Sequence, residues 1–234
     1  MRAKSKFLAL ALTAALQPAF AAPAPAEFSF EDLTTIADAN GMANLVQANY
    51  GAASGIQFTG SAWGVLTSKD CDGLVKFVPN ISGCGALMLS DNPGNGSTSS
   101  QRRTLTMNFA EGFISGSSLY YATLAGADVS IMLYENVDHS SGRSWSLGKL
   151  DGTGCVSELG AFYCDWNKII VDLKGGTARS MVVTGNDNSV IFDDFSLVRA
   201  TPVPPANLPE PAGIALTMAA LGALGWTRKR AAAR

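Results

Sequence analysis

The feature that most constrains the fold is a repeated alternation of apolar and polar residues over short runs. Residues 104–109 alternate Thr or Asn with Leu, Met and Phe, and residues 128–133 place Val, Ile and Leu at every second position. Positions 169, 171 and 173 are Ile, Val and Leu and repeat this period. A period of two places one set of side chains against a core and the other in water, which indicates β-strands.

Sequences rich in Gly, Asn and Asp, such as residues 91–96 and 185–188, separate these runs. About ten segments with strand character lie between such turns, at the spacing typical of a sandwich or barrel. We therefore predict an all-β fold over residues 26–199, an antiparallel, jelly-roll-like β-sandwich. Residues 34–48 alone have helical character, and Gly41 interrupts them, so a short N-terminal helical stretch is predicted there.

The first 21 residues have the three parts of a secretory signal peptide. Basic residues at positions 2, 4 and 6 precede an apolar run over residues 7–16, and Ala19-Phe20-Ala21 fits the small-x-small cleavage rule. Residues 22–25 form an Ala- and Pro-rich leader. The sequence thus predicts export through the Sec translocon and cleavage by signal peptidase.

The C-terminal segment contains a Pro-Glu-Pro motif, an uncharged apolar run over residues 212–227 and a basic cluster, in that order. As a helix, the apolar run would span about 24 Å, less than the ~30 Å of a hydrocarbon core. It can insert if Trp226 lies at the interface and the basic residues stay on the cytoplasmic side. A buried helix of a soluble domain is the alternative. The motif and the basic cluster consist of Pro209, Glu210, Pro211, Arg228, Lys229 and Arg230.

This arrangement resembles the PEP-CTERM sorting signal of exported Gram-negative proteins. The resemblance implies that a membrane-embedded exosortase recognises the tail, cleaves near Pro-Glu-Pro and releases the protein or transfers it outward. The transmembrane helix of 212–227 would then anchor the chain in the inner membrane only transiently, before it reaches the cell surface or the medium. Residues 200–208 contain three prolines and are expected to form a semi-rigid linker.

The charge of the central part differs from that of the whole chain, which has 17 basic and 19 acidic residues. Seven of the basic residues lie in the two terminal signals, whereas only Glu210 of the acidic residues does. Residues 22–209 therefore hold 10 basic and 18 acidic side chains, a net charge of −8. Such a charge argues against nucleic acid and anionic lipid as partners, and is compatible with divalent cations and neutral or cation-bridged polysaccharide. Solubility alone would also explain it.

Four cysteines lie in the predicted exported domain, and an even number in an oxidising compartment favours disulfides. Three pairings are possible, and we favour local ones because each brackets a loop-like run. Zinc is disfavoured because no Cys-x-x-Cys spacing occurs and the chain has one histidine. The favoured pairs are Cys71–Cys84 and Cys155–Cys164.

The two ends of the domain carry acidic residues within strand-like sequences. The first reads Phe-Ser-Phe-Glu-Asp-Leu from residue 28, and the last reads Val-Ile-Phe-Asp-Asp-Phe-Ser-Leu from residue 190. These ends resemble galactose-binding-like jelly rolls, including many carbohydrate-binding modules. The resemblance implies that the terminal strands lie side by side, with a structural calcium often between them.

The alternation in the last strand-like run supports this interpretation. Asp193 shares a strand face with Ile191 and Phe195, so its carboxylate is expected to point toward the core. A buried carboxylate must be paired, hydrogen-bonded or bound to a metal. Calcium could be held by Glu31, Asp193 and Asp194; the alternatives are that Asp193 caps backbone amides or pairs with Arg179.

Catalytic motifs are weak in this sequence, so we do not expect an enzyme. The only histidine, His139, lies in a predicted turn, and neither Gly-x-Ser-x-Gly nor His-Glu-x-x-His occurs. Trp145, Tyr163 and Trp166 are candidates for stacking on sugar rings. Two functions remain: a non-catalytic β-sandwich associated with exopolysaccharide or biofilm matrix, or a secreted hydrolase acting on polysaccharide whose site is not visible in the sequence.

Overall fold

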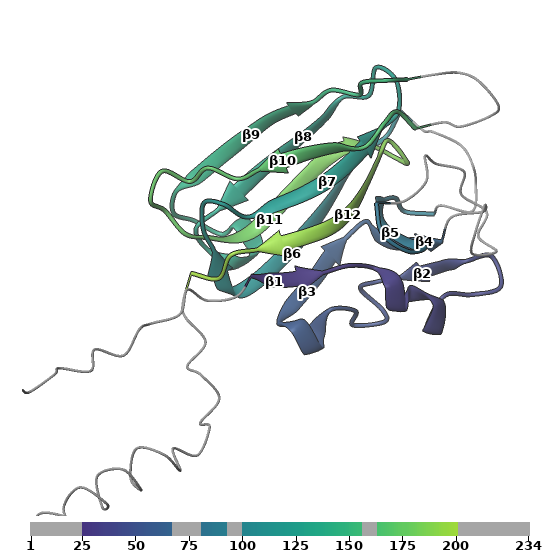
Figure 1. The fold of residues 1–234 in the computed structure, drawn as a ribbon, viewed down its shortest axis with the longest axis horizontal. Coiled ribbons are helices and arrows are strands. Elements are labelled where there is room, and N and C mark those ends of the chain that lie inside the picture. Colours follow the sequence, from purple (N-terminus) through teal and green to yellow (C-terminus); the bar gives the residue numbers. More distant parts are fainter. Residues whose placement is uncertain (1–24, 67–80, 93–99, 156–162, 201–234) are drawn as a thin grey trace, which may run out of the picture.

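The computed structural model describes residues 25–66, 81–92, 100–155 and 163–200, which form a β-sandwich of two sheets (Figure 1). The strands of one sheet run in the order β10-β7-β12-β5-β4-β2, with β1 paired to β12. The strands of the second run in the order β3-β6-β11-β8-β9. The paired strands are antiparallel, so the predicted all-β antiparallel sandwich is confirmed.

The seven-stranded sheet contains β1 (Ala26–Phe28), β2 (Met42–Asn44), β4 (Ala62–Leu66), β5 (Gly85–Leu89), β7 (Ser118–Thr123), β10 (Asn167–Ile170) and β12 (Val190–Leu197). The five-stranded sheet contains β3 (Ile56–Gly60), β6 (Arg102–Phe113), β8 (Val129–Tyr134), β9 (Ser144–Leu150) and β11 (Ala178–Asn186). The 3-10 turns within the described residues are η1 (Glu31–Thr35), η2 (Ala52–Ser54) and η4 (Val137–His139).

The main core lies between the two sheets and follows the alternation in the sequence. In β6, Leu105, Met107 and Phe109 are fully buried in this core. Met107 pairs with Met181 of β11, which in turn pairs with Leu133 of β8, so one row of the five-stranded sheet faces the core throughout. Because side chains of a strand alternate, the neighbouring row faces away from it.

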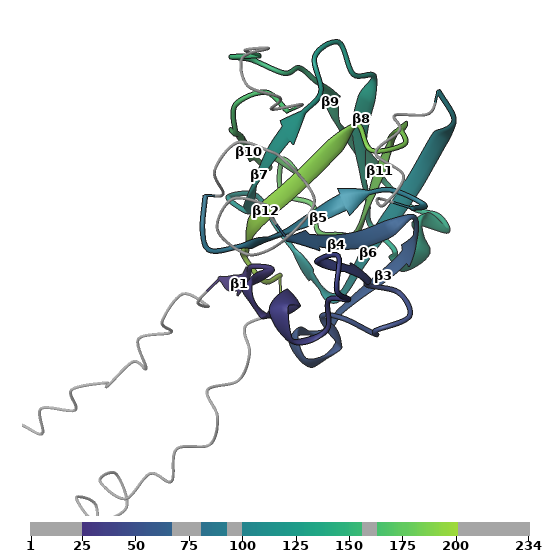
Figure 2. The same cartoon turned by 90° about the vertical axis from the view of Figure 1, so that its right-hand side faces the viewer.

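The first and last strands of the domain lie side by side, as the family resemblance implied. Ala26 of β1 pairs with Leu197 of β12, and Phe28 pairs with Phe195. The start of β1 therefore lies next to the end of β12 (Figure 2). This pairing brings η1, which follows β1, close to the acidic part of β12.

The expected direction of Asp193 is wrong, because β12 contains a β-bulge. The register with β7 shifts between Asp193 and Ser196, and Asp194 has a left-handed φ of 45°. The extra residue reverses the alternation, so Phe192 and Phe195 both face the main core. Ile191 instead belongs to a second apolar cluster outside it. Asp193 follows the alternation of Ile191 and points away from the main core.

The helical stretch predicted over residues 34–48 is also wrong. The segment instead contains the end of η1, strand β2 and turns. The carboxylate of Asp38 accepts hydrogen bonds from the backbone N–H groups of Asn40 (2.8 Å) and Met42 (3.1 Å), and Gly41 has a φ of 73°. A side chain that bonds to nearby backbone groups offers the chain an alternative to the helix, and here it stabilises a turn.

One predicted disulfide is confirmed: Cys155 and Cys164 are joined by an S–S bond of 2.01 Å. Cys84 is also disulfide-bonded, whereas Cys71 lies outside the described residues. The predicted signal peptide, most of the leader and linker, and the sorting signal with its helix over 212–227 likewise lie outside them. Within the described ranges, no helix has the length and apolar character needed to span a membrane.

Candidate functional site

The structure brings the three predicted calcium ligands to one place, where η1, β12 and the segment before β5 meet. The hydroxyl of Ser82 lies 2.6 Å from Asp194 Oδ1 and 3.2 Å from Glu31 Oε1. The backbone N–H of Cys84 donates to Glu31 Oε2 at 2.8 Å. A hydroxyl has one proton, so Ser82 can donate to only one of the two carboxylates at a time. The other carboxylate oxygen then faces the Ser82 hydroxyl oxygen with no proton between them. A cation or a second proton would relieve this repulsion.

Asp193 is the deepest member of this carboxylate cluster, which we define as Glu31, Asp193 and Asp194. Its side chain is 0% exposed. Oδ1 accepts the N–H of Asp194 at 2.8 Å, but Oδ2 is buried and has no hydrogen-bond partner. Burial raises the pKa of Asp193 to about 7, and the neighbouring charge of Asp194 adds to the effect. An orphaned oxygen in such a place is a position that a cation or a proton can occupy.

The expected alternatives for Asp193 are only partly met. It caps the backbone amide of Asp194, and hydrogen bonding to the amides of Asp194 and Ser82 opposes the rise in its pKa that burial causes. Arg179 does not pair with it, because its guanidinium donates to the carbonyl oxygens of Ala110 (3.3 Å) and Glu135 (3.4 Å). Among the described ion pairs, none involves the carboxylate cluster. Its negative charge therefore lacks compensation by a described basic side chain.

The donor set suits a hard cation such as Ca²⁺, but only with additional ligands. No group of three or more His, Cys, Asp and Glu side chains within the described ranges is arranged to hold a metal ion by itself. Calcium takes six to eight oxygens and accepts hydroxyl, carbonyl and water oxygens besides carboxylates. A calcium ion here would use Asp193 Oδ2, one further carboxylate and neutral oxygens such as the Ser82 hydroxyl, which already contacts Asp194.

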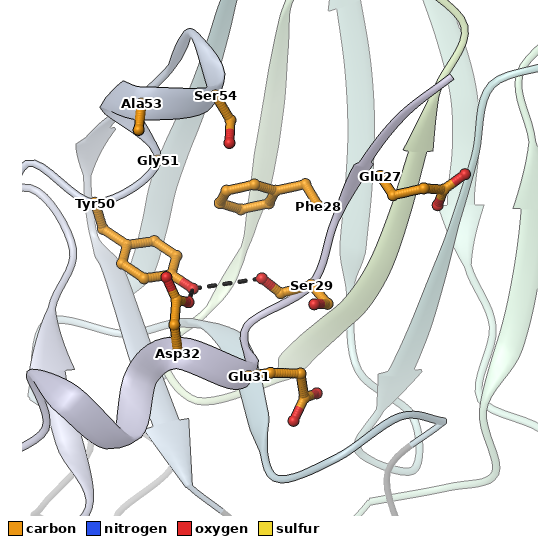
Figure 3. Close-up of a pocket in the computed structure, with 9 residues that line it drawn as sticks. All are labelled: Glu27, Phe28, Ser29, Glu31, Asp32, Tyr50, Gly51, Ala53 and Ser54. Carbon is orange, nitrogen blue, oxygen red and sulfur yellow. Dashed lines mark hydrogen bonds between the residues drawn. The ribbon is translucent and has the colours of Figure 1, made fainter. Parts of the chain in front are cut away.

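A pocket of about 270 Å³ lies on the other side of η1 (Figure 3). The side chains of Glu27 and Glu31 point away from its centre, so the rings of Phe28 and Tyr50 dominate its interior. The hydroxyl of Tyr50 hydrogen-bonds to Asp32 and lies 3.4 Å from the carbonyl oxygen of Ser29. Burial, followed by the hydrogen bond to Asp32, raises the pKa of Tyr50 above its usual range. The lining residues are Glu27, Phe28, Ser29, Glu31, Asp32, Tyr50, Gly51, Ala53 and Ser54.

This pocket is better explained by structure than by ligand binding. Tyr50 and Phe28 are 8% and 7% exposed, and both rings pack on Phe30. The hydroxyl of Tyr50 and the carboxylate of Asp32 are already bonded to each other. The pocket therefore closes the end of the main core rather than presenting free polar groups.

The predicted sugar-binding aromatics lie in three different environments. Tyr163 is 6% exposed and its hydroxyl donates to the carbonyl oxygen of Asn188 at 2.8 Å, so its ring is not presented to a ligand. Trp166 is half-buried against the second apolar cluster. Trp145 is half-buried against the main core, on the inward row of β9. These residues do not form one platform, although Trp145 and Trp166 are partly accessible.

The outward face of the five-stranded sheet has a composition that the sequence analysis did not single out. The strand registers place its residues in two rows that cross all five strands. Apart from Tyr134, Met132 and Val182, the side chains are hydroxyls and amides, and none is charged. Such groups both donate and accept hydrogen bonds without adding charge. The rows are Gln57, Asn108, Ser180, Tyr134, Ser144 and Thr59, Thr106, Val182, Met132, Ser146.

No known protein family matches the sequence, and no curated protein does. One similar solved structure is TmCBM61 in complex with beta-1,4-galactotriose, at 14% identity and a TM-score of 0.33, covering 62% of this chain and 89% of that one. Another is the K1 cleaved adhesin domain of Lys-gingipain from Porphyromonas gingivalis, at 12% identity and a TM-score of 0.37, covering 62% of this chain and 99% of that one.

A third is the CBM22-1–GH10 part of Clostridium thermocellum xylanase 10B complexed with xylohexaose. It has 10% identity and a TM-score of 0.37, and the match covers 79% of this chain but 30% of that one. All three TM-scores are below 0.5, so these likenesses identify neither a ligand nor an activity for this chain. Its function has to be inferred from its own residues.

Proposed function

We propose that this chain is an exported, sorted protein whose β-sandwich domain binds extracellular polysaccharide without catalysing a reaction. One observation carries the binding part: two adjacent outward rows of the five-stranded sheet contain hydroxyl and amide side chains and no charged side chain, and their exposed members are Gln57, Thr59, Ser144 and Ser146. A neutral polysaccharide presents the same kinds of groups, and hydrogen bonds between them need no compensation of charge. The net charge of −8 over residues 22–209 makes these two uncharged rows distinctive.

Export and sorting rest on the two terminal sequences. The signal peptide leads the chain through the inner membrane of a Gram-negative bacterium, and the PEP-CTERM-like tail directs it to an exosortase and then to the cell surface or the medium. The Cys155–Cys164 disulfide fits an oxidising destination. In that setting, a polysaccharide-binding domain would associate with the exopolysaccharide matrix.

Calcium has a structural role in this proposal. The ion would bind at the carboxylate cluster of Glu31, Asp193 and Asp194, joining the first turn of the domain to its last strand. It would supply positive charge where the described ion pairs supply none. Calcium would therefore stabilise the fold, whereas the polysaccharide would bind on the other sheet.

The alternative function, a secreted hydrolase, finds little support at the carboxylate cluster. The raised pKa of Asp193, about 7, would suit a general acid. However, the side chain is 0% exposed, so a polysaccharide cannot reach it in this conformation. Glycoside hydrolysis also requires a second carboxyl group on the other side of the same sugar bond.

Binding and turnover can be measured together on the exported protein. We expect affinity electrophoresis on a panel of neutral polysaccharides (glucan, galactan, mannan and xylan) to show retardation, and alginate to show less. Reducing-end assays on the same polysaccharides should stay at background. Release of reducing ends would support the hydrolase, and migration unaffected by every polysaccharide would refute the binding proposal. Trp145→Ala and Trp166→Ala should leave binding to this face unchanged, because their rings pack on the main core and on the second apolar cluster.

A further inference from the structure

A strained loop is hydrogen-bonded to the first outward row of the five-stranded sheet. Asp138 and His139 are consecutive non-glycine residues with left-handed φ angles of 55° and 48°. Residues with side chains adopt this conformation only at a free-energy cost, which must be offset by surrounding contacts. Two such residues in succession indicate that the loop is held in one particular shape.

The contacts that hold this loop come from buried polar side chains of the sheet. The backbone N–H of Asp138 donates to Asn108 Oδ1 at 2.9 Å, and Asn108 Nδ2 donates in return to the carboxylate of Asp138. The N–H of His139 donates to the hydroxyl of Ser180 at 3.3 Å, and that hydroxyl donates to the carbonyl oxygen of Asn136 at 2.9 Å. Asn108 and Ser180 are 5% and 0% exposed, so both are committed to positioning the loop.

The result of this positioning is a pair of accessible rings. The imidazole of His139 lies against the phenol ring of Tyr134, with centroids 5.7 Å apart and an interplanar angle of 52°. Tyr134 is half-buried and His139 is exposed. Tyr134 stands in the first outward row, between Ser144 and Ser180. An apolar surface is thus placed beside hydroxyl and amide groups, the combination that small polar ligands with an apolar face require.

We propose that Tyr134 and His139 form the stacking platform for one sugar ring of a neutral polysaccharide, with the exposed side chain of Ser144, the neighbour of Tyr134 in the same row, available to its hydroxyl groups. This inference rests on the proposed polysaccharide-binding function and assigns it to named residues. An anionic sugar is disfavoured because the carboxylate of Asp138 belongs to the same loop and the described domain carries excess negative charge.

The chain provides a specific probe and a matched control. His139 is the only histidine, so its imidazole gives a single set of NMR signals. Tyr120 is also a half-buried tyrosine, but it lies on the other sheet, 5.2 Å from the ammonium group of Lys168. Tyr120→Ala therefore removes a comparable ring from the opposite side of the molecule.

The experiment titrates the exported protein with the neutral polysaccharide of the panel that retards it most, and follows the His139 signals. We expect these signals to shift and broaden with added polysaccharide but not with alginate. Tyr134→Ala and His139→Ala should each weaken binding by about tenfold, the order expected for loss of a stacking ring. Tyr120→Ala should bind like the wild type, and near-UV circular dichroism checks that each variant is folded.

The outcomes separate the inference from the function on which it rests. If the wild type binds a neutral polysaccharide while the His139 signals stay unmoved and Tyr134→Ala binds normally, the platform is refuted and the binding function stands. If Tyr120→Ala loses as much affinity as Tyr134→Ala, the ligand lies on the wrong sheet for this inference. If no neutral polysaccharide binds the wild type, the proposed function fails, and the platform fails with it.

Discussion

The outward faces of the two sheets differ in the kind of side chain that they carry. On the seven-stranded sheet, Met42, Val65, Met88 and Ile191 form a second apolar cluster, and each of them is at most 6% exposed. On the five-stranded sheet, the corresponding face consists mainly of hydroxyl and amide side chains. One face is thus an extension of the core, whereas the other is suited to contact with a polar partner.

The buried polar groups on the two faces show the same difference. Asn108 and Ser180, on the five-stranded sheet, are hydrogen-bonded to the loop over residues 136–139. Asp193, on the seven-stranded sheet, has a buried carboxylate oxygen without a partner. A buried polar group that is satisfied stabilises a shape, whereas an unsatisfied one is costly unless a proton or cation joins it. This difference supports the proposals that a polysaccharide binds to one face and that a cation stabilises the other.

Equivalent substitutions on the two faces should have unequal effects on stability. Ile191→Thr removes apolar volume and places a hydroxyl in the second apolar cluster, so we expect it to lower the free energy of unfolding by about 3 kcal/mol. Val182→Thr, beside Thr106 on the other face, should lower it by less than about 1 kcal/mol. Urea unfolding measures both. Equal losses would contradict the distinction between the faces.

The second prediction concerns pH in the absence of divalent cations. Because the native pKa of Asp193 is about 7, above the ordinary value of 3.8, the folded state binds more protons than the unfolded state between these values. Stability from this group is therefore present below about pH 4 and is lost as pH rises toward 7. We expect the loss to be about 2 kcal/mol in EDTA, less than the full shift implies, because relaxation of the site reduces it.

Two variants test the assignment of this pH dependence. Asp193→Asn should abolish the loss, because its side chain does not titrate. Asp187→Asn should preserve it, although Asp187 is also buried (7% exposed), because Arg103 lies 3.9 Å from its carboxylate and compensates its charge. Urea unfolding at several pH values measures both variants. Persistence of the full pH dependence in Asp193→Asn would exclude Asp193 as its source.

The third prediction is that calcium, bound at the carboxylate cluster on the seven-stranded sheet, raises the free energy of unfolding of the domain. At a free concentration ten times the dissociation constant, binding to the folded state alone adds about 1.4 kcal/mol. For a domain of this size, that raises the melting temperature by about 3–6 °C. Asp194→Asn should reduce the gain, whereas Asp128→Asn, in an exposed pair with Arg102, should not. A melting temperature that is the same in Ca²⁺ and in EDTA would eliminate the calcium site.

The fourth prediction concerns the loop on the five-stranded sheet, where we expect a smaller effect on stability than that of calcium. Asn108→Ala removes the reciprocal hydrogen bonds to Asp138, so we expect a loss of about 1 kcal/mol. The His139 signals should then move toward those of a flexible loop, and polysaccharide affinity should fall. Thr106→Ala, two residues away on the same face, is the control and should leave the His139 signals in place. Unchanged signals in Asn108→Ala would show that other contacts position the loop.

The sheet architecture could be predicted from local patterns because alternation is a property of the strand itself. In residues 104–109 and 128–133, the apolar side chains at every second position, 105, 107, 109, 129, 131 and 133, lie in the main core, as their period requires. The Cys155–Cys164 disulfide was also a local inference, because it joins cysteines nine residues apart. The predicted helix over residues 34–48 failed because the side chain of Asp38 and the left-handed Gly41 favour turns over helical hydrogen bonds.

The candidate sites could be predicted only in part. The acidic residues at positions 31, 193 and 194 were recognised from their place at the two ends of the domain, and the pairing of β1 with β12 brings them together. The direction of Asp193 was not predictable, because one bulge residue reverses a strand's alternation. No signal in the sequence set Tyr134 apart from other tyrosines, and His139 reads as an ordinary turn residue.

By itself, the sequence determined the two-sheet architecture, one local disulfide and the signals expected to export and sort the chain. Each depends on residues close to one another along the chain. The tertiary structure alone decided which outward face became a second core and which stayed polar, because packing across strands distant in sequence sets burial. It also left Asp193 Oδ2 without a partner and placed His139 against Tyr134, since both depend on contacts between segments that no local pattern connects.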